Sequence, residues 1–186
     1  MVAIIVIVVI IVLAVLFFVV MYNGLVKRRN RVDQAWSQIG VQLERRHDLI
    51  PNLVETVKGY ASHERGTLEA VVQARNNAVQ AQQQAGPEQQ AQAENVLTGA
   101  LRQLFALSEA YPDLKANQNF LSLQEELTST EDRISYERQF YNDSVQTFNT
   151  AIKTFPRNVI AGMFNFQPRQ FFQAEQGAEE VPRVQF

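Results

Sequence analysis

The sequence contains no cysteine, and the signatures of several common kinds of site are also missing. The absence of cysteine excludes disulfides, thiolate metal sites, a cysteine nucleophile and a lipid-modified cysteine anchor. There is no Gly-x-Ser-x-Gly motif, and the eight glycines are scattered singly, so no glycine loop for a nucleotide is present. The formal charge of −2 lacks the basic excess that nucleic-acid-binding proteins usually carry. We therefore expect no nucleic-acid partner.

Histidine is also scarce, and neither His47 nor His63 predicts a metal site. On a continuous helix their separation would place them about 160° apart around the axis, so they could not share an ion. His63 and Glu64 begin like the zinc-protease helix motif, but Thr67 stands where the second histidine ligand is needed. We expect no catalytic residue, no metal and no cofactor. A hydrolase or metal enzyme is the least supported function class.

Charge is missing from Met1 to Tyr22, where valine, isoleucine, leucine and phenylalanine dominate. As a helix this run spans roughly 30 Å, the thickness of the hydrocarbon core of a bilayer. A cleaved signal peptide would need a basic start, a shorter apolar stretch and a small-residue cleavage site, none of which is present. The run predicts a transmembrane anchor at residues 1–22.

Basic residues follow this run directly, at Lys27, Arg28, Arg29 and Arg31. By the positive-inside rule this cluster places the N-terminus outside and the bulk of the chain in the cytoplasm. The same side chains could also lie against anionic lipid headgroups.

Residues 25–83 show one long helical pattern, whose apolar positions alternate in spacing between three and four. Arg46 and Glu64 interrupt it at positions where an apolar side chain is expected. The apolar positions are Val32, Trp36, Ile39, Leu43, Ile50, Leu53, Val57, Tyr60, Leu68, Val71 and Val72.

Pro51 lies inside this pattern and cannot donate a hydrogen bond to the carbonyl of His47. If the helix only kinks there, the domain is a bundle of three long helices. If the chain reverses near Asp48, the bundle has four. Because no glycine or asparagine marks a turn at Asp48, the sequence favours the kink.

Gly86-Pro87 is typical of a helical hairpin, with glycine after one helix and proline at the first position of the next. The glutamines around it, within residues 80–93, are expected to form a solvated tip. The following helix should run from about Glu88 to Ala110, with Leu97, Leu101, Leu104 and Leu107 on one side. Tyr111-Pro112-Asp113 should end it.

The clearest helical pattern comes last, in six apolar residues that follow one another at intervals of seven. Leu123, Val145 and Ile152 widen this face, and Phe155-Pro156 should end the helix. The six are Phe120, Leu127, Ile134, Tyr141, Phe148 and Phe155.

The tail after Pro156 has few helix signals but contains Phe164, Phe166, Phe171 and Phe172. We expect these rings to fold back onto the bundle, with a membrane surface or a neighbouring subunit as the alternative. Glu175 to Phe186 look frayed.

A charged cluster surrounds the proline: Arg45, Arg46, Asp48, Pro51 and Asn52. One interpretation is a partner or ligand site at the kink, and the other is an ion pair that sets the helix register. A buried charge must be paired. We therefore expect Arg46 to meet a carboxylate of the last long helix, Glu131 or Glu137.

Three stretches together resemble the LemA family. They are Tyr22–Val26 with Arg29-Asn30 and Ala35-Trp36; Arg45–Val54 with Gly59–Glu64; and Tyr111–Asn117 with Arg138–Asn142. The resemblance covers nearly the whole chain and implies a short outer N-terminus, one membrane helix and a helical bundle, with no established activity or cofactor. It also points toward membrane organisation or envelope stress. Gly40 departs from the pattern, because such sequences often carry an acidic residue there.

The sequence thus predicts an all-α fold, with a transmembrane helix at 1–22, an antiparallel bundle at 23–156 and an aromatic-rich tail at 157–186, flexible at its end. The leading hypothesis is a bacterial inner-membrane scaffold that self-associates or binds other membrane proteins, and whose partners include the lipid bilayer. A ligand- or signal-sensing module coupled to its anchor is the alternative.

Overall fold

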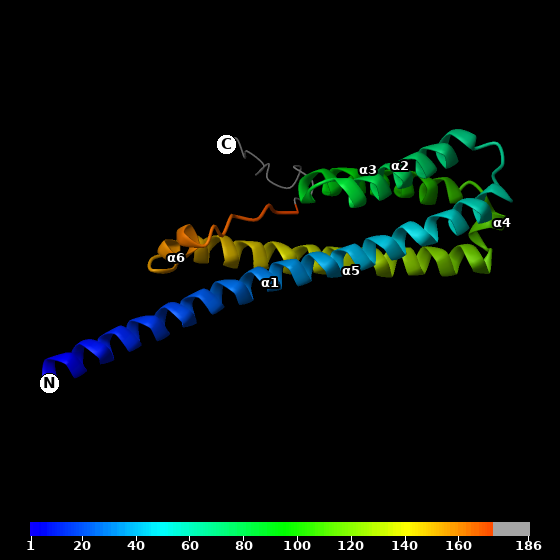
Figure 1. The fold of residues 1–186 in the computed structure, drawn as a ribbon. Coiled ribbons are helices and arrows are strands. Elements are labelled where there is room, and N and C mark those ends of the chain that lie inside the picture. The colour runs from blue at the N-terminus through cyan, green and yellow to red at the C-terminus, as the bar shows by residue number, and fades with distance from the viewer. Residues whose placement is uncertain (173–186) are drawn as a thin grey trace, which may run out of the picture. The chain divides into compact units, whose positions relative to one another are not determined.

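The computed structural model describes residues 1–172, and all the regular structure in that range is helical (Figure 1). The all-α expectation is therefore confirmed. The helices are α1 (Val2–Lys58), α2 (Arg65–Gln84), α3 (Pro87–Ser108), α4 (Pro112–Lys115), α5 (Gln118–Lys153) and α6 (Arg157–Met163).

Helix α1 continues through Pro51, so a reversal of the chain near Asp48 is wrong. Proline leaves the carbonyl of His47 without its usual donor within the helix. The Nε atom of Arg75 in α2 donates to that carbonyl oxygen at 3.2 Å. The missing backbone bond is thus replaced by a side-chain bond from the neighbouring helix, which explains how the helix tolerates proline.

The expectation of one helical pattern over 25–83 is wrong, because the chain leaves the helix between Lys58 and Arg65. Gly59 follows the last helical residue, and glycine costs about 1 kcal/mol relative to alanine inside a helix. The break produces four long helices, α1, α2, α3 and α5, although the fourth arises at Gly59 and not at Pro51.

The described residues form two compact units. Unit 1 contains Met1–Ser37 and Gln139–Gln170, and unit 2 contains Gln38–Arg138 with Phe171 and Phe172. Helices α1 and α5 each contribute a segment to both.

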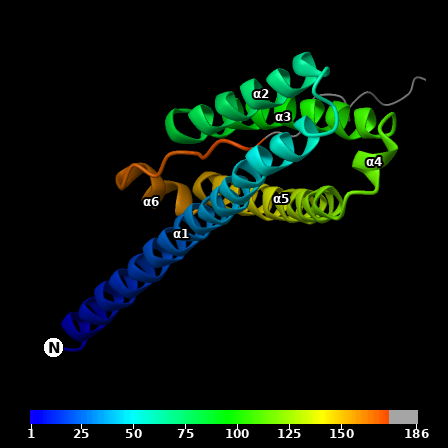
Figure 2. The ribbon, with the colours of Figure 1, turned by 90° about the vertical axis from the view of Figure 1, so that its right-hand side faces the viewer.

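In unit 2 the polar contacts show how the helices run. Arg75 of α2 bonds to His47 of α1, and Gln82 of α2 bonds to Gly40 of α1, so these two segments are antiparallel. Helices α2 and α3 lie side by side, joined at Gly86-Pro87 as the sequence predicts, and the short α4 links α3 to α5 (Figure 2).

The core of unit 2 is formed by apolar side chains of all four long helices. Among the most buried are Ile50, Leu53, Val71, Leu97, Leu104, Phe120 and Leu127. Two positions of the predicted apolar pattern are instead exposed, Tyr60 at 44% and Val72 at 41%. Tyr60 lies beyond the end of α1, where helical spacing no longer determines which side a residue faces.

The glutamine-rich tip is less solvated than expected. Gln90 is almost fully buried, and the half-buried Gln82 donates to the carbonyl oxygen of Gly40 at 3.1 Å. These two residues therefore pack against the bundle.

Helix α5 confirms five of the six positions in its heptad pattern. Phe120, Leu127, Ile134, Tyr141 and Phe148 are all buried. Phe155 is 78% exposed, because α5 ends at Lys153 and the periodicity stops with it.

In unit 1 the chain after Pro156 forms α6, a helix that the sequence analysis did not expect. Phe166 is buried beside Tyr22 and Phe148, while Phe164 contacts Tyr22 but remains 53% exposed. In unit 2, Phe172 is buried under the guanidinium of Arg138. The tail aromatics therefore fold back only in part, and the prediction for Glu175 to Phe186 lies outside the described residues.

Candidate functional site

The charged cluster around Pro51 divides by exposure. Arg46 is buried, whereas Arg45, Asp48, Pro51 and Asn52 all face solvent. The cause is the helix itself, because successive residues point about 100° apart around its axis. Arg45 makes an exposed ion pair with Glu126 of α5 at 2.6 Å.

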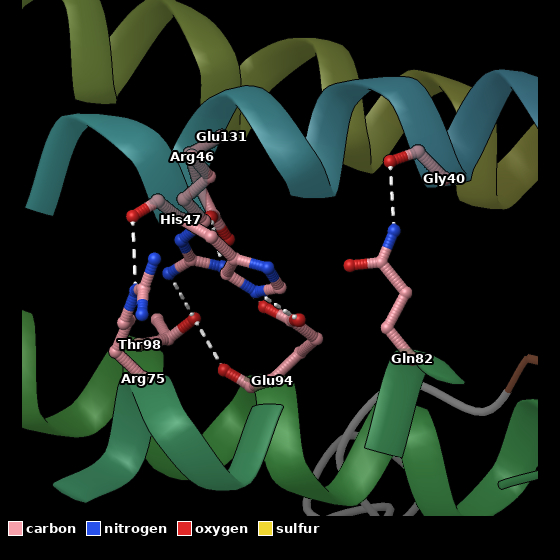
Figure 3. A network of polar contacts seen from close by, with 8 residues as sticks. All are labelled: Gly40, Arg46, His47, Arg75, Gln82, Glu94, Thr98 and Glu131. Atoms are coloured by element: carbon pink, nitrogen blue, oxygen red, sulfur yellow. Dashed lines mark hydrogen bonds and ion pairs between the residues drawn. The ribbon is translucent and has the colours of Figure 1, made fainter. Parts of the chain in front are cut away.

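Arg46 is the centre of a buried polar network that joins three helices (Figure 3). Its Nη1 lies 3.0 Å from Oε2 of Glu131 on α5 and 3.4 Å from Oε2 of Glu94 on α3. Its Nη2 donates to Oγ1 of Thr98 at 2.7 Å. The predicted pairing with Glu131 is confirmed, and Glu94 is an additional partner that sequence reasoning missed.

His47 completes the network. Its Nε2 lies 2.8 Å from Oε1 of Glu94, and both side chains are at most 4% exposed. The Glu94 carboxylate thus contacts two successive residues of α1. A signal for this was present, since Glu94 precedes Leu97, Leu101 and Leu104 at spacings of three and four and so lies on their buried face.

The contacts of the network connect the helices to one another. Thr98 accepts from Arg46 and donates to the backbone carbonyl of Glu94 at 3.0 Å, so its hydroxyl is not aimed at His47. The adjoining pocket, lined by Arg46, Thr98 and Glu131 among others, has a volume of about 160 Å³. Small-molecule sites usually measure about 300–1,000 Å³.

Metal-ligating clusters are not found in residues 1–172, where no group of three or more His, Asp or Glu side chains could hold an ion. His63 is exposed in the connection between α1 and α2. Glu64, the second polar interruption of the pattern, is half-buried and accepts a hydrogen bond from the Tyr111 hydroxyl at 2.9 Å. This hydrogen bond is the largest cause that raises the pKa of Tyr111.

The basic residues after the apolar run lie on different sides of α1. In unit 1, the guanidinium of Arg31 stacks over Phe140 at 5.0 Å and that of Arg29 over Phe166 at 5.5 Å. Arg28 donates from Nη1 to the carbonyl oxygen of Gly24 at 3.1 Å. Lys27, Arg28 and Arg31 border one pocket, and Arg29 does not line it.

The first part of α1 is apolar and unpacked. Its most hydrophobic window has a mean hydropathy of 3.8, and none of that window is buried. By length and composition, α1 is able to cross a membrane.

Comparison with known proteins decides the family, because the LemA family model matches residues 35–186. The chain belongs to the LemA family. It is 29% identical to Protein LemA of Metamycoplasma hominis over 169 residues, which covers 90% of this chain and 74% of that protein.

Magnetosome proteins are also among the relatives to which the chain is similar. The chain is 26% identical over 190 residues to Magnetosome protein MamQ 2 of Paramagnetospirillum magneticum. It is 25% identical over 190 residues to Magnetosome protein MamQ of Magnetospirillum gryphiswaldense. Each match covers 89% of this LemA-family chain and 69% of the relative. None of these names states an enzymatic activity.

Proposed function

We propose that this LemA-family protein is a non-enzymatic, membrane-anchored helical scaffold of the bacterial inner membrane. The observation that carries the proposal is the full exposure of the apolar start of α1. An uncovered apolar rod of this length is stable only in a hydrocarbon environment. The same helix continues without a break into the buried residues of unit 2, so the anchor and the bundle share one element.

The membrane anchor is tested by alkaline carbonate extraction of membranes from cells that produce the full chain. The unmodified protein should stay in the membrane pellet. A Val9→Glu, Leu13→Arg variant should move to the supernatant, because each charge at the centre of a span costs about 2.5–3.5 kcal/mol. Val41→Glu and Val96→Arg, at residues 56% and 61% exposed, are the matched control and should stay in the pellet. Extraction of the unmodified chain would contradict the proposal.

The proposed orientation, with the N-terminus outside and the bulk of the chain in the cytoplasm, is supported by the basic residues that follow the apolar run. The absence of native cysteine makes it testable by labelling single introduced thiols in intact cells. A membrane-impermeant maleimide should label Val2→Cys directly, and Gln83→Cys only after permeabilisation. The reverse pattern would mean that the orientation is inverted.

Self-association is part of the proposal and has its own test. The heptad faces that suggested it are largely buried within one chain, so a contact between copies must use exposed apolar residues such as Val41, Val96 and Tyr136. Light scattering of the detergent-solubilised protein, with the mass of the bound detergent subtracted, should give a protein mass above that of one chain. A single-chain mass at all concentrations would refute self-association and leave the anchor untouched.

A ligand-sensing function is the second candidate, supported by the pocket beside Arg46 and Glu131, whose volume of about 160 Å³ restricts it to a small ligand. A small polar ligand seated there would stabilise the folded bundle by mass action. Thermal-shift screening of polar metabolites tests this candidate, and the absence of any reproducible rise in melting temperature would argue against it.

A further inference from the structure

Within unit 1 a pocket of about 320 Å³ lies between α1 and the second half of α5. Helix α1 contributes Lys27, Arg28 and Arg31. Arg31 follows Lys27 by four residues and Arg28 by three, so it neighbours both of them on one side of the helix. The remaining lining residues lie on α5: Phe140, Asp143, Ser144 and Thr147. The volume is within the range of small-ligand sites.

The charge of this pocket suits a phosphate group. Lys27, Arg28 and Arg31 face Asp143 alone among the lining carboxylates, which leaves an excess of two positive charges. In the described part of the chain, none of the three basic side chains is in an ion pair within 4.0 Å. Arginine forms paired hydrogen bonds to phosphate oxygens, and lysine supplies a compact charge.

Two of the cations are already held in position. The ring of Phe140 supports the Arg31 guanidinium at 5.0 Å, and the Gly24 carbonyl oxygen accepts from Arg28 Nη1 at 3.1 Å. Ordering these long side chains in advance reduces the entropy that binding would cost. Thr147 is an exposed residue of the lining, whereas the Ser144 hydroxyl already donates to the Phe140 carbonyl oxygen at 2.8 Å.

The distance of the pocket from the end of the apolar run favours a membrane lipid as the source of the phosphate. At about 1.5 Å per residue, Lys27 lies roughly 8 Å and Arg31 roughly 14 Å beyond Tyr22, at the end of the apolar run. The headgroup layer of a bilayer is about 5–8 Å thick on each side. Lys27 therefore lies at the outer edge of the headgroup layer, and the long side chains of Arg28 and Arg31 would reach back toward the bilayer to meet a lipid phosphate.

A second observation places the bilayer surface at this level. The ring of Tyr22 lies 4.7 Å from that of Phe164, and aromatic residues collect at membrane–water interfaces. Three apolar residues of the neighbouring segment are also exposed. Phe155, in the turn before α6, is 78% exposed, and Val159 and Met163 of α6 are 50% and 67% exposed. Val159 and Met163 are four residues apart within α6 and so share one apolar face of that helix, whereas Phe155 precedes it in the turn.

We propose that this pocket binds the phosphate of an anionic phospholipid such as phosphatidylglycerol. The proposal rests on the membrane anchoring proposed above. It differs from the general attraction of any basic segment to an anionic surface, which is worth about 1 kcal/mol per residue wherever the charge lies. In a defined pocket, by contrast, the contribution of each basic residue to lipid binding depends on its position.

Arg29 supplies the matched control, because it belongs to the same basic run but stacks over Phe166 and does not line the pocket. The full chain is purified in a non-ionic detergent and titrated with dioctanoyl phosphatidylglycerol, and binding is followed by native mass spectrometry. We expect one lipid per chain. Arg28→Gln with Arg31→Gln should weaken binding at least tenfold, and Arg29→Gln less than twofold. Circular dichroism checks that each variant remains helical.

Four results would overturn the proposal. Equal losses for the Arg29 and pocket variants would mean general electrostatic attraction only. Inorganic phosphate that binds as tightly as the lipid would make free phosphate the ligand, and equal binding of dioctanoyl phosphatidylcholine would remove the role of net charge. A gain-of-binding variant keeps the test independent of folding defects: Asp143→Asn should tighten binding, and a loss would contradict an anion site. Because the assay uses detergent, its failure is distinct from failure of the carbonate extraction.

Discussion

The Nε2 atom of His47 lies 2.8 Å from the Oε1 atom of Glu94, with both side chains almost completely removed from solvent. The second oxygen of the same carboxylate lies 3.4 Å from Arg46, the residue before His47. One acidic side chain of α3 therefore contacts both Arg46 and His47 of α1. Buried charges depend strongly on their partners, so Glu94 should be the most sensitive position of this network.

Glu94→Ala should destabilise the protein by about 3–5 kcal/mol, because it leaves the buried Arg46 with Glu131 as its remaining carboxylate. Glu126→Ala is the matched control, since Glu126 pairs with Arg45 at an exposed position and such pairs contribute about 0–1 kcal/mol. Urea unfolding in detergent, followed by circular dichroism, measures both. Similar losses of unfolding free energy in the two variants would mean that the buried carboxylate contributes no more to stability than the exposed one.

Replacing both charges should cost less than the sum of the single replacements. Arg46→Leu leaves Glu94 buried beside His47 only, and Glu94→Leu leaves Arg46 short of a carboxylate. The double variant removes both unpaired charges and leaves Glu131, whose side chain is 40% exposed although its Oε2 is buried. A double-mutant cycle should give a coupling of about 1–3 kcal/mol. Strict additivity would exclude a direct Arg46–Glu94 interaction.

Two glutamines of the predicted solvated tip should respond in opposite directions. Gln82→Met removes the bond to the Gly40 carbonyl and should cost about 0.5–1.5 kcal/mol. The Oε1 of Gln90 is buried and finds no hydrogen-bond partner in the described residues. Gln90→Met should therefore leave stability unchanged or raise it by about 1 kcal/mol. Melting temperatures of the two variants provide the comparison, and a shared sign would refute this account of the tip.

Gly40→Ala should stabilise the protein by about 0.5–1 kcal/mol, the usual gain when alanine replaces glycine within a helix. A Cβ atom at Gly40 would lie 3.9 Å from Nε2 of Gln82, which is ordinary contact. Gly59→Ala, beyond the end of α1, should bring no comparable gain in chemical denaturation. A lower unfolding free energy for Gly40→Ala would show that the added methyl group disturbs the hydrogen bond from Gln82 to the Gly40 carbonyl oxygen, despite the 3.9 Å distance.

Tyr141 should make stability fall at alkaline pH. Burial raises its pKa, Arg169 lowers it and Asp33 raises it, with a net upward shift. The folded state therefore keeps the phenol proton to a higher pH than the unfolded chain does. This contribution to stability is complete below the unfolded pKa of about 10 and is lost as the pH rises through the folded pKa.

Tyr141→Phe removes this titration and also the hydrogen bond to the Gln170 carbonyl oxygen. Its melting temperature should start lower at pH 8 but decline less steeply toward pH 11 than that of the unmodified protein. Tyr136→Phe, at a residue 67% exposed, is the control and should decline as the unmodified protein does. Parallel declines for all three proteins would contradict the assignment.

The sequence was sufficient to predict what depends on local spacing. The heptad positions of α5 and the Gly86-Pro87 hairpin were predicted correctly, because periodicity and turn residues act over a few positions. The end of α1 at Lys58 was missed because apolar spacing continues from Val57 to Tyr60 and Leu68 across the break. Helical periodicity records which side chains can be buried, and it does not show where the backbone leaves the helix.

Contacts between distant parts of the chain were harder to predict. The pairing of Arg46 with Glu131 followed from the rule that a buried charge needs a partner. The burial of Glu94 follows from its spacing to Leu97, but its partners do not, because they lie 47 and 48 positions earlier in the chain. The tolerance of Pro51 depends on Arg75 in the same way, since the replacement donor lies 28 positions beyond His47.

The order of these residues has a consequence for synthesis on the ribosome. Arg46 and His47 emerge long before their partners on α3 and α5, and the nearest in sequence, Glu94, follows Arg46 by 48 positions. An early hairpin of α1 and α2 alone would enclose two basic groups without their carboxylate. We therefore expect this stretch of α1 to stay hydrated until α3 has left the exit tunnel.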